Sequence, residues 1–168
     1  MTALATPRMD LSSVDESAVI ASICRDSLWE FVKEFWDVVT EEPLIQNWHM
    51  PFLCRQLEEV AERVFLRQKK KHDLLINISP GTSKSTIVSV MFPAWCWTRA
   101  PWVQVICGSY AESLSEFLAT KSRDIITSEK YQKCFPQIVL RRDSLGKSFF
   151  QNTRGGWRYS GGCGGSVT

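Results

Sequence analysis

The chain has 168 residues, a length that suits one domain and allows a sizeable buried core. Apolar residues make up 44% and charged residues 23%, which is ordinary for a globular protein and excludes wholesale disorder or a collagen-like repeat. Twenty basic and 18 acidic residues leave a formal charge of +2. Since a charge this small gives no overall attraction to nucleic acid or anionic lipid, any such binding must come from a local patch.

The cysteines form no metal-ligand pattern, because none belongs to a Cys-x-x-Cys pair and no histidine stands at a suitable spacing. The N-terminus lacks the basic start and apolar run of a secretory signal, and no apolar stretch approaches the roughly 20 residues that span a bilayer. We therefore expect a cytosolic protein with reduced thiols, mostly in the core. These thiols are Cys24, Cys54, Cys96, Cys107, Cys134 and Cys163.

Residues 1–13 are interpreted as a flexible leader, and residues 14–72 as a helical segment. Apolar residues at spacings of three to five predict one amphipathic helix over 14–39, with helix-start chemistry at Asp15 and Ser17. A second helix is predicted to begin at Met50-Pro51. Lys69, Lys70 and Lys71 follow it, either as cations at the negative end of a helix dipole or as a phosphate-contacting patch.

Strands and helices alternate after residue 72. Strands are predicted over 73–78, 103–107 and 138–140, and helices over 87–97 and 111–128, with Pro93 expected to bend or end the first of these helices. A hairpin with Gly155-Gly156 in its turn closes the pattern. This order predicts an α/β fold whose parallel sheet is covered on both faces and binds ligands at the carboxyl ends of its strands.

One segment has the composition of a phosphate-binding loop. After the strand DLLINI, Pro80, Gly81, Thr82 and Ser83 would form the turn, Lys84 would face the phosphates, and Ser85, with Thr86 beside it, would hold Mg²⁺. The consensus expects glycine where this chain has Ile78 and Ser83, so we expect an altered loop geometry with flexibility supplied by Gly81. An ordinary Ser/Gly/Pro turn is the alternative, and the strand–loop–helix context favours phosphate binding.

Two further positions have competing interpretations. Trp48, beside His49, could stack on a base, but a packing contact at the start of the second helix is the favoured interpretation. Arg154 and Arg158 flank the Gly155-Gly156 turn, where an arginine could act as a finger on a neighbour's nucleotide or simply be a surface charge.

Several ordered blocks are similar to one family. The blocks DLLINISPGTSKST, FPAWCW, VQVICGSYAESLSEFLATKSRDII and EKYQKCFP together resemble the ATPase domain of tailed-bacteriophage terminase large subunits. The resemblance runs from about residue 44 to residue 168. Members of that family often have an irregular loop before Lys-Ser, as this chain does.

The resemblance implies a P-loop NTPase sheet of the RecA/ASCE type, with the first part of the ATPase domain over residues 73–168, and ATP and Mg²⁺ as cofactors. By position, Lys84 would contact the β- and γ-phosphates, Ser85 would hold Mg²⁺, and the backbone of residues 80–83 would form the cradle. Trp48 falls near the adenine-contacting region of the family, and Arg158 is the arginine-finger candidate.

The resemblance also implies partners. Terminase large subunits form a homo-oligomeric ring on the portal protein of an empty capsid, in the host cytoplasm, and package double-stranded DNA that a small terminase subunit selects. A C-terminal nuclease domain cuts the DNA. These are the expected activity, location and partners of a complete protein of this type.

One departure from the family changes the expectation for this chain. Phosphoryl transfer needs an acidic residue to organise Mg²⁺ and a second group to orient water, and the terminase family places both as an acidic pair at the end of an apolar strand. The strand after Lys84 that fits best is followed by Arg141-Arg142. We expect that the chain stops before the acidic strand and the nuclease, and that alone it binds nucleotide weakly without turnover. The alternatives are another P-loop NTPase, such as a helicase-like enzyme, and a non-catalytic nucleotide-binding fragment.

Overall fold

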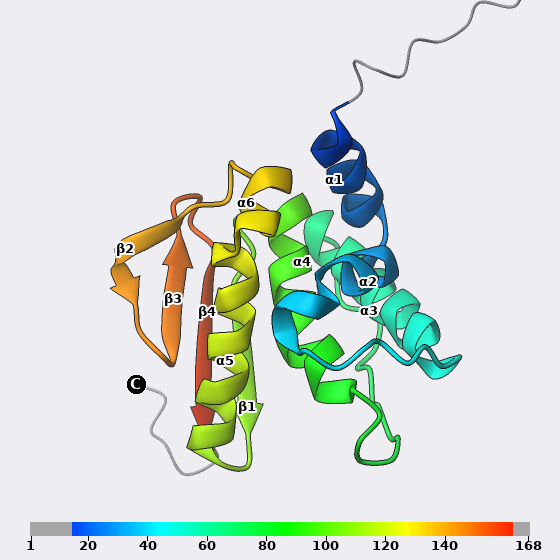
Figure 1. The fold of residues 1–168 in the computed structure, drawn as a ribbon. Coiled ribbons are helices and arrows are strands. Elements are labelled where there is room, and N and C mark those ends of the chain that lie inside the picture. The colour runs from blue at the N-terminus through cyan, green and yellow to red at the C-terminus, as the bar shows by residue number, and fades with distance from the viewer. Residues whose placement is uncertain (1–14, 163–168) are drawn as a thin grey trace, which may run out of the picture.

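A computed structural model describes residues 15–162, whose strands form one four-stranded mixed sheet with helices packed against it (Figure 1). The strands are β1 (Val105–Ser109), β2 (Leu140–Leu145), β3 (Phe149–Asn152) and β4 (Trp157–Gly162). They lie in the order β1-β4-β3-β2. The prediction of an α/β fold is confirmed. The prediction of a parallel sheet is wrong, because only β1 and β4 are parallel and the short connections of β2, β3 and β4 make those pairs antiparallel.

The single helix predicted over 14–39 is two helices, α1 (Glu16–Asp26) and α2 (Leu28–Val39). The break lies at Ser27, whose backbone is extended and whose hydroxyl accepts a hydrogen bond from the amide of Glu30. Asp15 caps α1 through the amide of Ser17, as expected. Both caps satisfy amides that the first turn of a helix leaves without partners. The predicted leader over 1–13 lies outside the described residues.

The second predicted helix is α3 (His49–Phe65), with Pro51 in its first turn. Its buried face includes Leu53 and Leu57. The chain then runs without regular structure until the turn at Pro80. Because α3 ends at Phe65, the three lysines at 69–71 lie several residues beyond the last turn, where a helix dipole has little effect.

The strand predicted over 73–78 is absent from the structure, so this prediction is wrong. Leu74 and Ile76 are half-buried against the core, whereas Leu75 between them is 92% exposed, which is the alternation of an extended chain. A strand also needs a hydrogen-bonded neighbour. Within residues 15–162, the outer strand β1 pairs only with β4, so no ladder includes this segment.

The helix after residue 83 continues through Pro93 instead of ending there. It begins at Lys84, widens into the π-helix η2 (Thr86–Met91), and continues directly as α4 (Phe92–Arg99). Pro93 lies in the first turn of α4. The expected disturbance by the proline therefore takes the form of a wide turn before it.

Helix α5 (Glu112–Thr127) packs against β4 and β1, and the short α6 (Glu129–Cys134) follows it (Figure 1). In the described part of the chain, Ile106 on β1 is 66% exposed, so the sheet is not covered on both faces as predicted. The hairpin of β3 and β4 is confirmed, with Gly155 at a φ of 89° in its turn.

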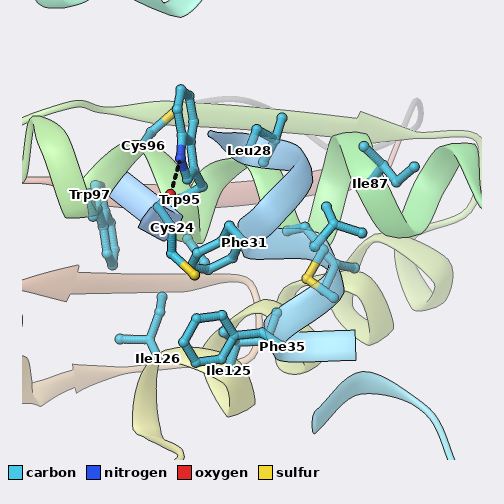
Figure 2. Close-up of a cluster of buried hydrophobic side chains, with 14 of the residues drawn as sticks. Cys24, Leu28, Phe31, Phe35, Ile87, Trp95, Cys96, Trp97, Ile125 and Ile126 are labelled. Atoms are coloured by element: carbon cyan, nitrogen blue, oxygen red, sulfur yellow. Dashed lines mark hydrogen bonds between the residues drawn. The ribbon is translucent and has the colours of Figure 1, made fainter. Parts of the chain in front are cut away.

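The N-terminal helices share one hydrophobic core with the α/β part. Figure 2 shows Leu28, Phe31 and Phe35 of α2 beside the indole of Trp95 and the side chains of α5. The indole N–H of Trp95 donates to the carbonyl of Cys24 at 2.9 Å. The segments predicted as 14–72 and 73–168 are therefore packed together around a common interior in the described residues.

The cysteines within the described residues are all free thiols, as expected. Cys24, Cys54 and Cys96 are buried, and Cys107 and Cys134 are half-buried. Cys163 lies outside the described residues.

Candidate phosphate-binding site

The loop between Ile78 and Lys84 has two residues with left-handed backbone. Gly81 has a φ of 78° and Ser83 a φ of 59°. Ser83 stands at the position where a phosphate-binding consensus has glycine, and it adopts the conformation that glycine reaches most easily. At this position the serine takes the left-handed conformation at a cost of about 1–2 kcal/mol, and the expectation that the loop as a whole differs from the consensus geometry stays a prediction.

Lys84 is the first residue of the helix and is half-buried. Its ammonium donates across the loop to the carbonyl of Ile78 at 3.4 Å. The hydroxyl of Thr82 donates to the carbonyl of Ser79 at 2.8 Å, and the amide of Ile87 donates to the carbonyl of Ser83 at 3.0 Å. These bonds close the loop on itself and place a cation beside the start of a helix, an arrangement suited to an anion.

His49 connects the loop to α3. Its Nε2 atom lies 3.2 Å from the carbonyl oxygen of Thr82, which requires that nitrogen to carry the proton. Sequence reasoning assigns His49 no role of its own, because a histidine 33 positions away in the chain shows no local signal of this contact. The contact places the residues at the N-terminal end of α3 next to the turn.

Trp48 is 77% exposed, and its ring lies edge-on to the ring of His49 with 6.2 Å between the centroids. This exposure does not fit the favoured interpretation of a packing contact at a helix start, which would cover the indole. A cavity of about 230 Å³ beside it is lined by Trp29, Gln46, Asn47, Trp48 and Pro51. Trp48 thus has a free aromatic face near the loop.

Ser85 is exposed and helical, and the side chain of Thr86 is partly buried. Ser85 is therefore the better placed of the two hydroxyls for a ligand that reaches the loop from solvent. Together with Lys84 and the backbone of residues 80–83, it gives the site one cation, one free hydroxyl and the amides of a turn that leads into a helix. This group of donors matches a polyphosphate.

Arg158 lies far from the expected surface position. It belongs to β4, is 1% exposed, and donates to the hydroxyl of Ser160 and the carbonyl of Ser89. Its burial argues against a role as an arginine finger, since a guanidinium enclosed in the core does not reach a neighbouring subunit. Arg154, in the turn before β4, is exposed. The burial pattern of β4 explains the position of Arg158, because alternate residues of the strand face the helices.

The lysines beyond α3 are exposed, and only one of them has an ion pair among the described residues. Lys70 contacts the carboxylate of Asp73 at 2.7 Å, and the side chain of Arg63 donates to the carbonyl of Lys69. The interpretation that Lys69, Lys70 and Lys71 contact phosphate stays a prediction.

Comparison with known proteins gives no relative: no family model, no curated protein and no solved structure matches this chain. Among residues 15–162, no helix is long and apolar enough to cross a membrane. The same residues contain no group of three or more acidic, histidine or cysteine side chains arranged to hold a metal ion.

Proposed function

We propose that this chain is the nucleotide-binding part of the ATPase domain of a phage terminase large subunit, built on a P-loop NTPase fold. The observation that carries the proposal is the left-handed backbone of Ser83 immediately before Lys84, the first residue of the helix. A residue that accepts the cost of this conformation has a local reason to do so, and presenting a turn to a phosphate is such a reason. The resemblance of several ordered blocks to terminases supports the finer assignment.

In this proposal each residue of the loop has one task. The backbone amides of residues 80–83 cradle the phosphates, and the ammonium of Lys84 exchanges the carbonyl of Ile78 for the β- and γ-phosphate oxygens. Ser85 holds Mg²⁺ through its hydroxyl, and the ion neutralises charge on the phosphates when it is bound. The exposed ring of Trp48 stacks on adenine.

The wider role rests on the resemblance to terminases. The chain would act in a homo-oligomeric ring at the portal protein, in the host cytoplasm, and would move double-stranded DNA selected by a small terminase subunit. The net charge of +2 fits a part of the motor whose main contact is the nucleotide, with DNA contacted by local patches.

Titration with a fluorescent ATP analogue in the presence of Mg²⁺ tests the nucleotide site. We expect Lys84→Ala to weaken binding at least tenfold, because it removes the only side-chain cation described at the loop. Lys133→Ala is the matched control, since Lys133 is an exposed lysine on α6 whose one ion pair among residues 15–162 is with Glu129. Equal affinity of Lys84→Ala and the parent chain would refute the nucleotide site.

The coding sequence downstream of Thr168 tests the terminase assignment separately from nucleotide binding. A terminase gene continues into an apolar strand that ends in an Asp-Asp or Asp-Glu pair, followed by a nuclease domain with clustered carboxylates. A downstream sequence with helicase-like features instead would assign the chain to another P-loop NTPase.

A further inference from the structure

The helix that runs from Lys84 to Arg99, called here the phosphate-loop helix, contains a π-helical turn with an identifiable cause. Pro93 has no amide proton, and its ring collides with the carbonyl four residues earlier in a regular α-helix. That carbonyl belongs to Ser89, which lies inside the π-helix Thr86–Met91. The wide turn thus occupies the stretch in which Pro93 removes the normal donor and crowds the normal acceptor.

Arg158 supplies a donor to the same carbonyl. Its Nη2 atom donates to the carbonyl of Ser89 at 2.9 Å, and its Nη1 atom donates to the hydroxyl of Ser160 at 2.7 Å. The bond to Ser89 connects strand β4 to the middle of the phosphate-loop helix, whereas the bond to Ser160 lies within β4. The Arg158–Ser89 bond joins residues that are 69 positions apart in the sequence.

The burial of this guanidinium is costly. Arg158 is 1% exposed, no carboxylate is among its partners in the described residues, and its Nε atom has no hydrogen bond there. Burial lowers the pKa of Arg158, and the thiol of Cys107 opposes this effect. An apolar side chain would fill the same space without that cost, so the hydrogen bond to Ser89 needs a reason beyond packing.

We propose that Arg158 is a positioning residue that fixes the wide turn of the phosphate-loop helix and thereby sets the direction of Lys84 and Ser85. Ser89 lies five positions after Lys84, or about 7 Å along a helix. A shift of the turn by one residue would rotate Lys84 by about 100° around the helix axis and move its ammonium away from the loop. This inference rests on the proposed nucleotide site for its functional consequence, but the Arg158–Ser89 link is measurable without nucleotide.

A merely structural role for Arg158 makes a different prediction. If the side chain only fills the core, removing it has the same effect whatever residue stands at position 93. If it replaces the donor that Pro93 lacks, Pro93→Ala restores an amide at position 93, and the carbonyl of Ser89 regains a partner within the helix. The dependence of one substitution on the other therefore distinguishes the two roles.

The experiment compares the parent chain, Arg158→Met, Pro93→Ala and the double variant by amide hydrogen exchange of the peptide that covers 84–91. We expect Arg158→Met to speed exchange at least tenfold when Pro93 is present and less than threefold in the Pro93→Ala background. Ser160→Ala is the control, because it removes the other hydrogen bond of Arg158 and should leave this exchange rate unchanged. Equal acceleration in both backgrounds would overturn the inference.

Affinity for the fluorescent ATP analogue gives the functional readout on the same proteins. Arg158→Met should weaken binding at least fivefold when Pro93 is present and less than twofold in the Pro93→Ala background. If Arg158→Met does not fold, Arg158→Lys takes its place, since a lysine keeps the charge but has one donor group instead of a fork. If the parent chain binds no nucleotide, the proposed function fails while hydrogen exchange still decides the link between Arg158 and Ser89.

Discussion

Single residues in the candidate site adopt conformations that local sequence rules do not favour. Ser83 has a left-handed backbone, and Ser85, two positions later, is helical. Since the two serines lie in opposite backbone regions within one short segment, the same substitution should have opposite effects at the two positions. This contrast tests the loop conformation directly.

We expect Ser83→Gly to raise the free energy of unfolding by about 0.5–1 kcal/mol, because glycine avoids the left-handed cost of about 1–2 kcal/mol but loses more chain entropy on folding. Ser85→Gly should lower it by about 0.5 kcal/mol, since glycine is a poorer helix former than serine. Urea unfolding of both variants is the measurement. Destabilisation by both substitutions would contradict the left-handed backbone at Ser83.

The buried thiols predict how stability changes with pH. Burial raises the pKa of Cys24 and that of Cys54 to about 12, with nearby glutamates adding to the effect. In the unfolded chain these thiols ionise near pH 8.5, so the unfolded state binds fewer protons than the folded state above that pH. Stability that is fully present below about pH 8.5 should therefore be lost as the pH rises toward 12.

Each of these thiols should contribute a slope of about −1.2 kcal/mol per pH unit between pH 9 and 10, because most of the unfolded thiol is ionised there and the folded thiol is not. Urea unfolding at several pH values measures the slope. Cys54→Ala should reduce the slope by the contribution of one thiol, even if the substitution also changes the free energy of unfolding at pH 7. A slope that Cys54→Ala leaves unchanged would show that Cys54 ionises freely in the folded protein.

At the scale of elements, helices α1 and α2 are separated by one residue, Ser27, which caps both of them. Ser27 ends α1 with an extended backbone and caps α2 through its hydroxyl. Hydrophobic spacing alone cannot show this break, because the apolar face continues across it from Cys24 to Leu28 and Phe31. The available local signal was Ser27 with Glu30 three positions later, a spacing typical of a helix start, but within a helical pattern this spacing also occurs without a break.

Ser27→Ala should lower the free energy of unfolding by about 1 kcal/mol, because the amide of Glu30 loses its acceptor. Ser27→Asn should keep most of the stability, since asparagine is an equally good N-cap. Thermal unfolding followed by circular dichroism measures both. A stable Ser27→Ala together with a destabilised Ser27→Asn would argue for one continuous helix.

Other elements show which patterns predict structure and which do not. Helices α3 and α5 and the hairpin of β3 and β4 were predictable, because their periodicity and turn residues act over a few positions. The segment DLLINI has strand composition, yet a strand also needs a neighbour, which no local pattern supplies. The residues of the loop follow a local sequence motif and could therefore be predicted. The contact of His49 and the burial of Arg158 depend on segments far away in the sequence and could not be predicted.

At the scale of the whole molecule, the N-terminal helices and the α/β part share aromatic contacts. Phe35 of α2 lies 5.7 Å from Tyr131 and 6.4 Å from Phe135, measured between ring centroids, and all three side chains are fully buried. A core that crosses between the two segments couples their stability. We therefore expect one cooperative unfolding transition.

Phe35→Ala should lower the free energy of unfolding by about 3–5 kcal/mol, through lost burial and the cavity that remains. Far-ultraviolet circular dichroism and tryptophan fluorescence should report the same midpoint for this variant and for the parent chain. Two separate midpoints would show that the N-terminal helices unfold independently of the sheet.

The central claim is that residues 79–86 bind the phosphates of a nucleotide, and amide chemical shifts measure this most directly. Addition of Mg²⁺ and a non-hydrolysable ATP analogue should shift the amides of Gly81, Ser83, Lys84 and Ser85 most strongly, with a smaller shift at the Trp48 indole. The Lys84→Ala variant should show much smaller shifts at the same concentration. Shifts that are absent, or that fall mainly outside the loop and the start of α3, would contradict the account.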